Sequence, residues 1–516
     1  MTRAMFPAVM LGARQRESQR GAVQWSNSRL ARAGNSQAFE RRGMKARLQV
    51  MKFGGTSVGD ASCIARTAKI IIDAAKECRC VAVVSAMSGV TNRLIEAAKL
   101  AQAGKAVEAA AILDALAHQH ETALAGLVSK DADRKSISRS MAEVFAEGHR
   151  LCEGTALLRE LTPRTLDAIA SLGERLSAPL VAAAIREGGA ASEAIEATEL
   201  IATDAFHGGA EPQMELTRQK SEARLRPLLE KGILPVVTGF IGATAEGQLT
   251  TLGRGGSDFS ATILGAALDA NEVIIWTDVD GVLTADPRLV PDARTIPEIS
   301  YREAAELAYF GAKVLHPKTL NPVVQAAIPV WIRNSFAPER PGTKITPGGR
   351  SIGGGVKALT AIRDVTLISV GGPGIVGLPD VVGRTFSTTA EVRASVLLIS
   401  QSSSQNDICF IVSTADAQRT VEALRKEFAQ DVAHHNVEHI TMDTNIAIVA
   451  VVGENMRGIP GVAGKTFSAL GREGVNLIAI AQGSSESNIS FVIEEKAVQA
   501  ALNTTHREFG LGNTSA

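Results

Sequence analysis

The chain has 516 residues, of which 45% are hydrophobic and 21% are charged, and its formal net charge at pH 7 is zero. This length predicts a globular protein of about two to four domains. Aromatic residues make up only 4% of the sequence, which argues against a stacking surface for nucleic acid, and the absence of an apolar run of about 18 residues argues against a membrane span.

Charge and cysteine usage narrow the function classes further. After residue 47 the chain holds 44 basic and 52 acidic residues, so its body is mildly acidic and no nucleic-acid partner is predicted. The five cysteines, including Cys78 and Cys80, lack the spacing of a zinc site. We interpret them as reduced thiols and predict no protein-ligated metal.

Residues 1–46 are predicted to lie outside the fold. Residues 1–47 hold ten Lys or Arg but only two Glu, without a clear apolar period. One interpretation is an organellar transit peptide, which would direct the protein to a plastid. The other is a disordered extension, or a start assigned upstream of Met44. We favour the second because hydroxyl residues are few, and it predicts a cytoplasmic protein.

The segment that follows predicts a mainly parallel α/β sheet. An apolar strand at 48–53, a helix at 61–76 and a second strand at 80–86 form a βαβ unit. Further segments predict an Ala-rich helical region at about 92–160 and strands at 233–242, 272–277 and 328–333. A Gly/Pro-rich stretch at 338–355 then breaks the pattern, so we place the end of this domain, residues 47–345, there.

The C-terminal part contains an internal repeat with an offset of 81 residues. "GRTFS" at 383–387 recurs as "GKTFS" at 464–468, and "ISQSSSQNDICFIV" at 399–412 recurs as "IAQGSSESNISFVI". Matched stretches at one offset indicate a duplicated unit. Each copy reads as strand, Gly-rich turn, helix, strand, polar turn and strand, which predicts two small α/β modules at 346–435 and 436–516.

The stretch "KFGGTS" places Lys52 at the end of the first strand, just before Gly54 and Gly55. Backbone amides of glycines at a helix N-terminus can approach a phosphate closely. In the P-loop, however, the lysine follows the glycines. Taken alone, the stretch is therefore as well explained by an ordinary turn after a strand.

Three later stretches also place charged or polar side chains beside glycines or next to the predicted end of a strand or start of a helix. "TLGRGGSDFSA" at 251–261 combines glycines with Arg254, Ser257 and Asp258 where a helix is predicted to begin. Arginine offers a bidentate fork for a carboxylate or phosphate. "WTDVDGVLTADPR" at 276–288 is an acidic loop after a strand, without the closing glutamate of an EF-hand, and "SLGERLSA" sets Glu174 among small residues.

Together these stretches resemble an aspartate kinase of the amino-acid kinase superfamily. The motifs that carry the resemblance, in the order of the family, are "KFGGTSV", "VVSAMSGVTN", "SLGERLSA", "TLGRGGSDFSA", "WTDVDGVLTADPR" and "FGAKVLHP". The resemblance covers about residues 48–510. It implies a mainly parallel sheet sandwiched by helices, followed by two ferredoxin-like ACT modules, and transfer of the ATP γ-phosphoryl group to the side-chain carboxylate of L-aspartate, with Mg²⁺ accompanying ATP.

The resemblance also implies roles for individual residues. Lys52 would stabilise the transferred phosphoryl group, with Gly54 and Gly55 donating backbone hydrogen bonds, and Asp258 would hold Lys52 in place. The aspartate pocket would be formed by Glu174, Arg254, Ser257, Ser85 and Thr91. The ATP-binding positions would be Thr277, Asp278, Arg288 and Lys313. Leu283 departs from the family, where a tyrosine often packs on the nucleotide.

Regulation and assembly are implied by the repeat. Gln401 and Gln482 are equivalent under the offset, and their surroundings resemble the threonine-responsive branch, so we expect inhibition by L-threonine, with L-lysine as the alternative effector. ACT pairs commonly associate, so a homodimer or tetramer is expected. Because the sequence ends at residue 516, a monofunctional kinase is expected. The rival hypotheses are an inactive amino-acid sensor and a kinase acting on glutamate or N-acetylglutamate.

Overall fold

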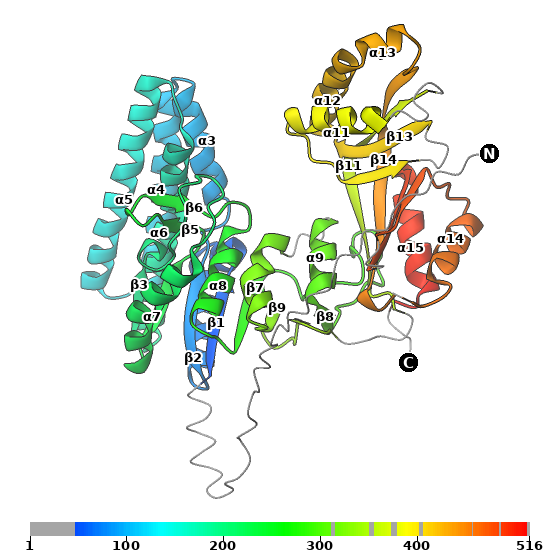
Figure 1. Cartoon of the computed structure of the whole chain (residues 1–516). Helices are drawn as coiled ribbons and strands as arrows, with labels where there is room; N and C mark the ends of the chain where they lie inside the picture. Colours follow the sequence, from blue (N-terminus) through cyan, green and yellow to red (C-terminus); the bar gives the residue numbers. More distant parts are fainter. Residues whose placement is uncertain are drawn as a thin grey trace, which may run out of the picture. The chain divides into compact units, whose positions relative to one another are not determined.

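The computed structural model describes most of the chain after residue 46 (Figure 1). The described residues are 47–310, 315–349, 355–372, 379–401, 406–456, 458–483 and 487–512. Within them, two sheets with their helices make up the amino-terminal and carboxy-terminal parts of the fold, and a small two-stranded sheet accompanies the first. The predicted leader, residues 1–46, lies outside the described residues.

The amino-terminal part is built on an eight-stranded sheet in the order β3-β4-β2-β1-β7-β9-β10-β8. All neighbours are parallel except β9 and β10, which confirms the predicted mainly parallel sheet. Its strands are β1 (Leu48–Phe53), β2 (Arg79–Val84), β3 (Ser192–Ile195), β4 (Leu234–Thr238), β7 (Glu272–Thr277), β8 (Glu298–Ser300), β9 (Val330–Asn334) and β10 (Thr343–Thr346).

Helices cover both faces of this sheet because its strands are apolar on both sides. Met51 and Phe53 of β1 pack into one core with the helices α2 to α6, whereas Val50 packs into a second core with α7 and α8. The helices of this part are α2 (Ala61–Ala75), α3 (Val90–Gln102), α4 (Ala106–Leu127), α5 (Asp131–Leu158), α6 (Pro163–Glu187), α7 (Met214–Glu230), α8 (Gly256–Ala267), α9 (Tyr301–Tyr309) and α10 (Asn321–Gln325). This alternation along β1 sends Lys52 toward the face that carries α8.

Helix α6 is the central helix of the first core. Thr162 caps its start by accepting a hydrogen bond from the Thr165 amide, and Pro163 occupies its first position. It is the one helix among the described residues that is long and apolar enough to cross a membrane, but 83% of its most apolar window is buried inside the protein. Its apolar surface is therefore used by α2, α3, α5 and the sheet.

The predicted strand at 233–242 is interrupted in the structure. Strand β4 ends at Thr238, and Gly239 and Phe240 separate it from β5 (Ile241–Ala243), which pairs with β6 (Leu249–Thr251) in the two-stranded sheet. Phe240 has a φ of 70°, a left-handed conformation that is rare for a bulky residue. The continuous apolar run concealed this break because both flanking segments are buried.

The carboxy-terminal part is a six-stranded antiparallel sheet in the order β12-β13-β11-β14-β16-β15. The strands are β11 (Ala358–Gly371), β12 (Leu398–Gln401), β13 (Asp407–Ser413), β14 (His439–Val452), β15 (Ala479–Ala481) and β16 (Asn488–Glu494). Its helices are α11 (Pro379–Glu391), α12 (Thr414–Glu427), α13 (Ala429–Ala433), α14 (Val462–Arg472) and α15 (Val498–Glu508). The two edge strands, β12 and β15, contact each other.

Each copy of the repeat contains more than the predicted pattern. The copies run β11-α11-β12-β13-α12 and β14-α14-β15-β16-α15, so each has a second helix that the repeat's short motifs did not indicate. The second helix packs its apolar face on the sheet, through Val421 and Leu424 in one copy and Ala501 and Leu502 in the other. The first helix of each copy packs into the same core, so the two helices together cover this face of the sheet.

Buried polar contacts join residues of the two parts. Lys357 Nζ lies 2.6 Å from Glu303 Oε2, and both side chains are 1% exposed. Glu303 also completes a capping box with Ser300 at the start of α9 and accepts the Glu454 amide. A buried ion pair with this many hydrogen bonds is costly to break from one side.

Candidate active site

Lys52 and Asp258 form an ion pair at the end of β1. Lys52 Nζ lies 2.6 Å from Asp258 Oδ1, and the two side chains are only 11% and 14% exposed. Asp258 stands in the first turn of α8, where the helix dipole favours a negative charge. The structure therefore brings these two predicted residues together and fixes the Lys52 side chain beside the carboxyl end of the central strand.

The two glycines after Lys52 differ in what their backbones do. The Gly54 amide donates a hydrogen bond to the Trp276 carbonyl at 3.1 Å, so it is already engaged within the protein, and its donation to a phosphate stays a prediction. A Cβ on Gly55 would lie 3.0 Å from the Ala86 carbonyl oxygen, so this position favours glycine. Gly55 opens a short 3₁₀ helix, Gly55–Val58, whose first amides point away from its own turn.

Glu174 is a buried carboxyl group with an incomplete set of hydrogen bonds. Its side chain projects from α6, it is 3% exposed, and its Oε2 has no hydrogen-bond partner among the described residues. Burial raises the pKa of Glu174 to about 8, although the Ala86 amide and nearby Lys52 act in the opposite direction. Such a group can accept a cationic ligand that repays its lost hydration.

A glycine brings Glu174 to this position. A Cβ on Gly173 would lie 2.6 Å from the Cβ of Ala86, so only glycine lets α6 approach the turn after β2 this closely. Ser177, one turn further along α6, donates to the Ser85 carbonyl at 2.7 Å. The helix is thus attached to the end of β2 on either side of Glu174.

Arg254 lies in the loop between β6 and α8. Its side chain is exposed, and no hydrogen bond or ion pair to another described residue is seen for its guanidinium group. Gly253 and Gly255 flank it with φ values of 77° and 71°, which glycine adopts without strain. Ser257 is buried in the first turn of α8. The loop therefore presents a cation next to a helix N-terminus, where a carboxylate is favoured.

The remaining pocket residues predicted from sequence lie where β2 leads into α3. The Ser85 amide donates to the Phe53 carbonyl at 3.1 Å, so its segment runs beside the end of β1. Thr91 is in the first turn of α3 and both residues are partly exposed. Ser85 thus belongs to the same end of the sheet as Lys52.

The predicted nucleotide-binding residues are only partly described. Thr277 ends β7 and donates to Asp278 Oδ1 at 3.2 Å, which places both at the carboxyl edge of the sheet. Arg288 is 84% exposed and pairs with Asp286 of its own loop at 2.6 Å, so it is not turned into a pocket in this structure. Lys313 lies outside the described residues.

The two predicted effector residues occupy equivalent places. Gln401 is the last residue of β12, and Gln482 directly follows β15. Both side chains are exposed, and the strands that carry them contact each other. The polar turns that follow, residues 402–405 and 484–486, lie outside the described residues.

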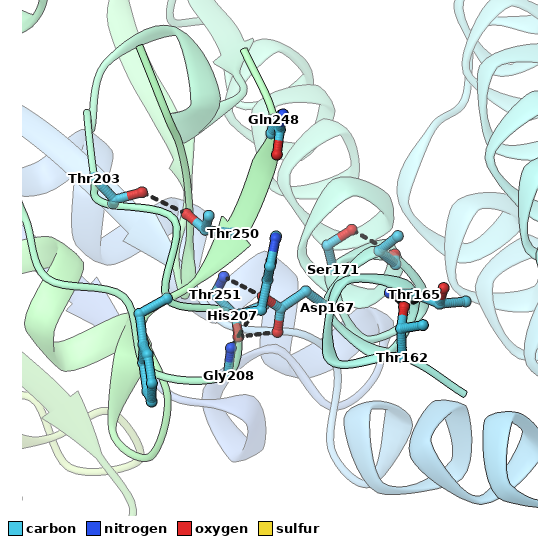
Figure 2. Close-up of polar contacts among 12 residues, drawn as sticks. Thr162, Thr165, Asp167, Ser171, Thr203, His207, Gly208, Gln248, Thr250 and Thr251 are labelled. Atoms are coloured by element: carbon cyan, nitrogen blue, oxygen red, sulfur yellow. Dashed lines mark hydrogen bonds and ion pairs between the residues drawn. The ribbon is translucent and has the colours of Figure 1, made fainter. Parts of the chain in front are cut away.

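Two residues at this site were missed by sequence reasoning. Phe240 follows Gly239, which packs against Ser257. The Phe240 amide donates a hydrogen bond to Ser260 Oγ at 2.9 Å, and its carbonyl oxygen accepts one from the Leu252 amide, near the loop that carries Arg254. Asp167 accepts four hydrogen bonds from two loops (Figure 2). Nothing in the local sequence around either residue indicates these contacts.

No group of three or more His, Cys, Asp or Glu side chains able to hold a metal ion is found within the described ranges. Asp258 is engaged by Lys52, and the acidic loop after β7 pairs its Asp280 with Arg340. A Mg²⁺ ion that arrives with a nucleotide would be coordinated chiefly by the phosphates and water, which is its usual mode in phosphoryl-transfer sites.

Comparison with known proteins identifies both parts of the chain. The amino acid kinase family model matches residues 47–334, and the ACT domain model matches residues 368–428 and 449–509. The starts of the two ACT matches, 368 and 449, differ by 81 residues, which equals the offset of the sequence repeat. The duplicated module predicted from sequence is thereby confirmed.

Curated relatives are aspartokinases, alone or fused to a second enzyme. The chain is 33% identical over 471 residues to the chloroplastic aspartokinase 1 of Arabidopsis thaliana, covering 89% of this chain and 80% of that protein. It is 35% identical over 476 residues to the chloroplastic bifunctional aspartokinase/homoserine dehydrogenase of Daucus carota, covering 90% of this chain and 51% of that protein. The chain spans about half the length of the bifunctional relatives it matches.

Solved structures of the same class align over nearly the whole described chain. E. coli aspartokinase III in complex with aspartate and ADP is 31% identical, with a TM-score of 0.73 and coverage of 90% of this chain and 99% of that one. The aspartate kinase of Clostridium acetobutylicum is 25% identical, with a TM-score of 0.75 and coverage of 89% and 100%. The arrangement of sheet, helices and duplicated module is therefore shared with these proteins.

Proposed function

The chain belongs to the aspartate kinases of the amino acid kinase family, and we propose that it transfers the γ-phosphoryl group of ATP to the side-chain carboxylate of L-aspartate, giving 4-phospho-L-aspartate. The observation that carries this proposal is the buried Lys52–Asp258 pair beside the half-satisfied carboxyl group of Glu174. A related structure, that of E. coli aspartokinase III, holds aspartate and ADP.

The chemistry requires positioning and charge neutralisation more than covalent catalysis. A side-chain carboxylate oxygen of aspartate attacks the γ-phosphorus, the bond to the β,γ-bridging oxygen breaks, and ADP leaves. The attacking carboxylate is already ionised at neutral pH, so no general base is needed. Lys52 would neutralise charge on the transferred group, and Asp258 would hold its ammonium in place.

Recognition of aspartate would use opposite charges on two segments. The free oxygen of Glu174 would accept the α-ammonium group, and the guanidinium of Arg254 would bind the α-carboxylate as a bidentate pair. Ser85, Thr91 and Ser257 would line the rest of the pocket. The nucleotide would lie along Thr277 and Asp278 at the end of β7, with Lys313 and a rearranged Arg288 at its phosphates.

A hydroxamate assay tests this reaction directly. Purified protein is incubated with Mg²⁺-ATP, hydroxylamine and either L-aspartate or L-glutamate, since hydroxylamine traps an acyl phosphate and ignores simple ATP hydrolysis. We expect aspartate hydroxamate and an equal amount of ADP. No hydroxamate at millimolar aspartate would favour an amino-acid sensor, and preference for glutamate would favour another acyl-phosphate kinase of the family.

Inhibition by L-threonine is the second part of the proposal. Its support is the symmetric exposure of Gln401 and Gln482 at the ends of two contacting strands. A related structure, that of E. coli aspartokinase III, holds lysine, so L-lysine is the competing effector. Gln401→Ala and Gln482→Ala should each weaken inhibition and leave uninhibited turnover nearly unchanged. Inhibition by lysine alone, or by no end-product amino acid, would overturn the threonine assignment.

Self-association through the duplicated module is also part of the proposal. The edge strands β12 and β15 expose Ile399 and Ile480 by 51% and 45%, and these two residues are equivalent in the repeat. Exposed apolar side chains on edge strands favour association with another chain. Light scattering should give at least a dimer mass, and Ile399→Lys should shift it toward the monomer. A monomer at micromolar concentration would refute this part.

A further inference from the structure

Asp167 binds two loops to the helix that carries Glu174. Its Oδ2 accepts hydrogen bonds from His207 Nδ1 at 2.9 Å, from the Gly208 amide at 3.0 Å and from the Thr251 amide at 3.1 Å. Its Oδ1 accepts the Thr251 hydroxyl at 2.5 Å. Figure 2 shows the carboxylate projecting from α6 into the gap between the His207 loop and the end of β6.

These contacts connect the two segments expected to grip aspartate. Asp167 stands seven residues before Glu174 on α6, which puts both side chains on one face of the helix, two turns apart. Thr251 ends β6, three residues before Arg254. One carboxylate therefore ties the helix of Glu174 to the loop of Arg254.

The loop that carries His207 also packs against the loop that carries Arg254. The Ala210 amide donates to the Thr251 carbonyl at 2.9 Å. A Cβ on Gly253 would lie 3.0 Å from the Gly208 carbonyl oxygen, so the Arg254 loop packs on the backbone of the His207 loop. By holding His207 and Gly208, Asp167 fixes the surface on which the Arg254 loop rests.

We propose that Asp167 is a positioning residue that sets the spacing between Glu174 and Arg254 and thereby the affinity for the amino-acid substrate. This inference rests on the proposed aspartate kinase activity. Asp167 is 3% exposed, and its four hydrogen bonds come from the His207 loop and from Thr251 at the end of β6. A displacement of about 1 Å between two binding groups can cost about 100-fold in activity.

A carboxylate suits this position better than its neutral analogue. Ionised aspartate offers about four acceptor sites and no donor, which matches three N–H groups and one hydroxyl. Asparagine can keep one oxygen toward the three N–H groups and turn its NH₂ toward Thr251 Oγ1, which can accept. Asp167→Asn should therefore preserve most of the geometry, whereas Asp167→Ala leaves buried donors without a partner.

The test separates positioning from general destabilisation. We would compare wild type, Asp167→Ala, Asp167→Asn and Thr251→Val with a control, Leu113→Ala, which removes a buried side chain of α4 from a different hydrophobic core than that of Leu252. The measurements are the apparent Tm and the KM values for aspartate and ATP. We expect Asp167→Ala to raise the KM for aspartate about 10- to 100-fold and to leave the KM for ATP within about twofold, with intermediate values for Asp167→Asn.

Each outcome decides between the alternatives. If both KM values rise together, or if Leu113→Ala at an equal loss of Tm reproduces the aspartate effect, the positioning role is refuted. If Asp167→Ala does not fold, the other two variants test the positioning role. An unchanged KM for aspartate in both Asp167→Asn and Thr251→Val would then refute that role. If wild type forms no aspartate hydroxamate, the proposed function itself fails, and this inference fails with it.

Discussion

Replacing Glu174 with glutamine should stabilise the ligand-free protein while weakening its binding of aspartate. The wild-type carboxyl group is buried, and one of its oxygens has no hydrogen-bond partner among the described residues. Its pKa is raised from 4.5 to about 8 because burial penalises the charged form. Glutamine has the same shape, accepts the same hydrogen bonds through its carbonyl oxygen, and is never charged.

The expected magnitude follows from proton linkage. Between pH 4.5 and about 8 the folded protein keeps the proton on Glu174, whereas the unfolded chain has released it. The unfolded state therefore binds fewer protons, and the free energy of unfolding falls as pH rises, by about 1.4 kcal/mol per pH unit. From pH 6 to pH 8 the wild type should lose about 2 kcal/mol that Glu174→Gln does not lose, and the difference should level off above pH 8.

The measurement is urea denaturation of both proteins at pH 6, 7, 8 and 9, without ligand and with saturating L-aspartate. The ammonium group of aspartate should offset the cost of burying the ionised Glu174 carboxylate. Added substrate should therefore stabilise wild type far more than the variant. In the hydroxamate assay the variant's KM for aspartate should rise about 100-fold, since a buried charge pair loses one partner. Glu160→Gln, at an exposed loop position just after α5, is the matched control and should change neither quantity.

Two results would refute this reasoning. If the stability difference between wild type and Glu174→Gln is the same at every pH, then Glu174 does not hold a proton in the folded protein over that range. If the variant keeps the wild-type KM for aspartate, then the unpartnered oxygen is not the site of the α-ammonium group. The first result would remove the proposed proton linkage, and the second would remove Glu174 from the substrate pocket; neither would affect the position of Lys52.

Three further predictions concern other buried groups. Lys52→Met should lower kcat about 10³-fold, because the charge that meets the transferred phosphoryl group is lost, with the hydroxamate assay as the check and unchanged turnover as the refutation. Lys357→Met should lower the free energy of unfolding by about 3–5 kcal/mol, since it leaves Glu303 buried without its cation; a change under about 1 kcal/mol in urea denaturation would contradict this. Burial lowers the pKa of His506, which hydrogen-bonds Thr284, so stability should fall on acidification below about pH 6.5, and less in His506→Gln; equal Tm losses would contradict this.

Periodicity and motif order predicted the broad architecture because they depend on local sequence. Short apolar runs located β1 and β7, and the 81-residue repeat located the duplicated module. Three details of the structure did not follow from the sequence. The amide of Gly54 bonds to the Trp276 carbonyl of a distant strand, Arg288 pairs with Asp286 of its own loop, and the backbone turns at Phe240 inside an apolar run. The first depends on a distant segment, and the other two depend on local backbone geometry that residue type alone does not determine.

Three buried carboxylates of the kinase part show what distinguishes a ligand group from a structural one. Asp167 receives four hydrogen bonds, Asp258 is paired with Lys52, and Glu174 has one oxygen without a partner in the described residues. A fully bonded carboxylate holds its donors in place, and an under-bonded one carries a cost that a ligand can remove. Sequence motifs include Glu174 and Asp258 but assign Asp167 no role. The number of bonds that each carboxylate makes, which only the fold determines, therefore separates the residue that positions the pocket from the residue that binds in it.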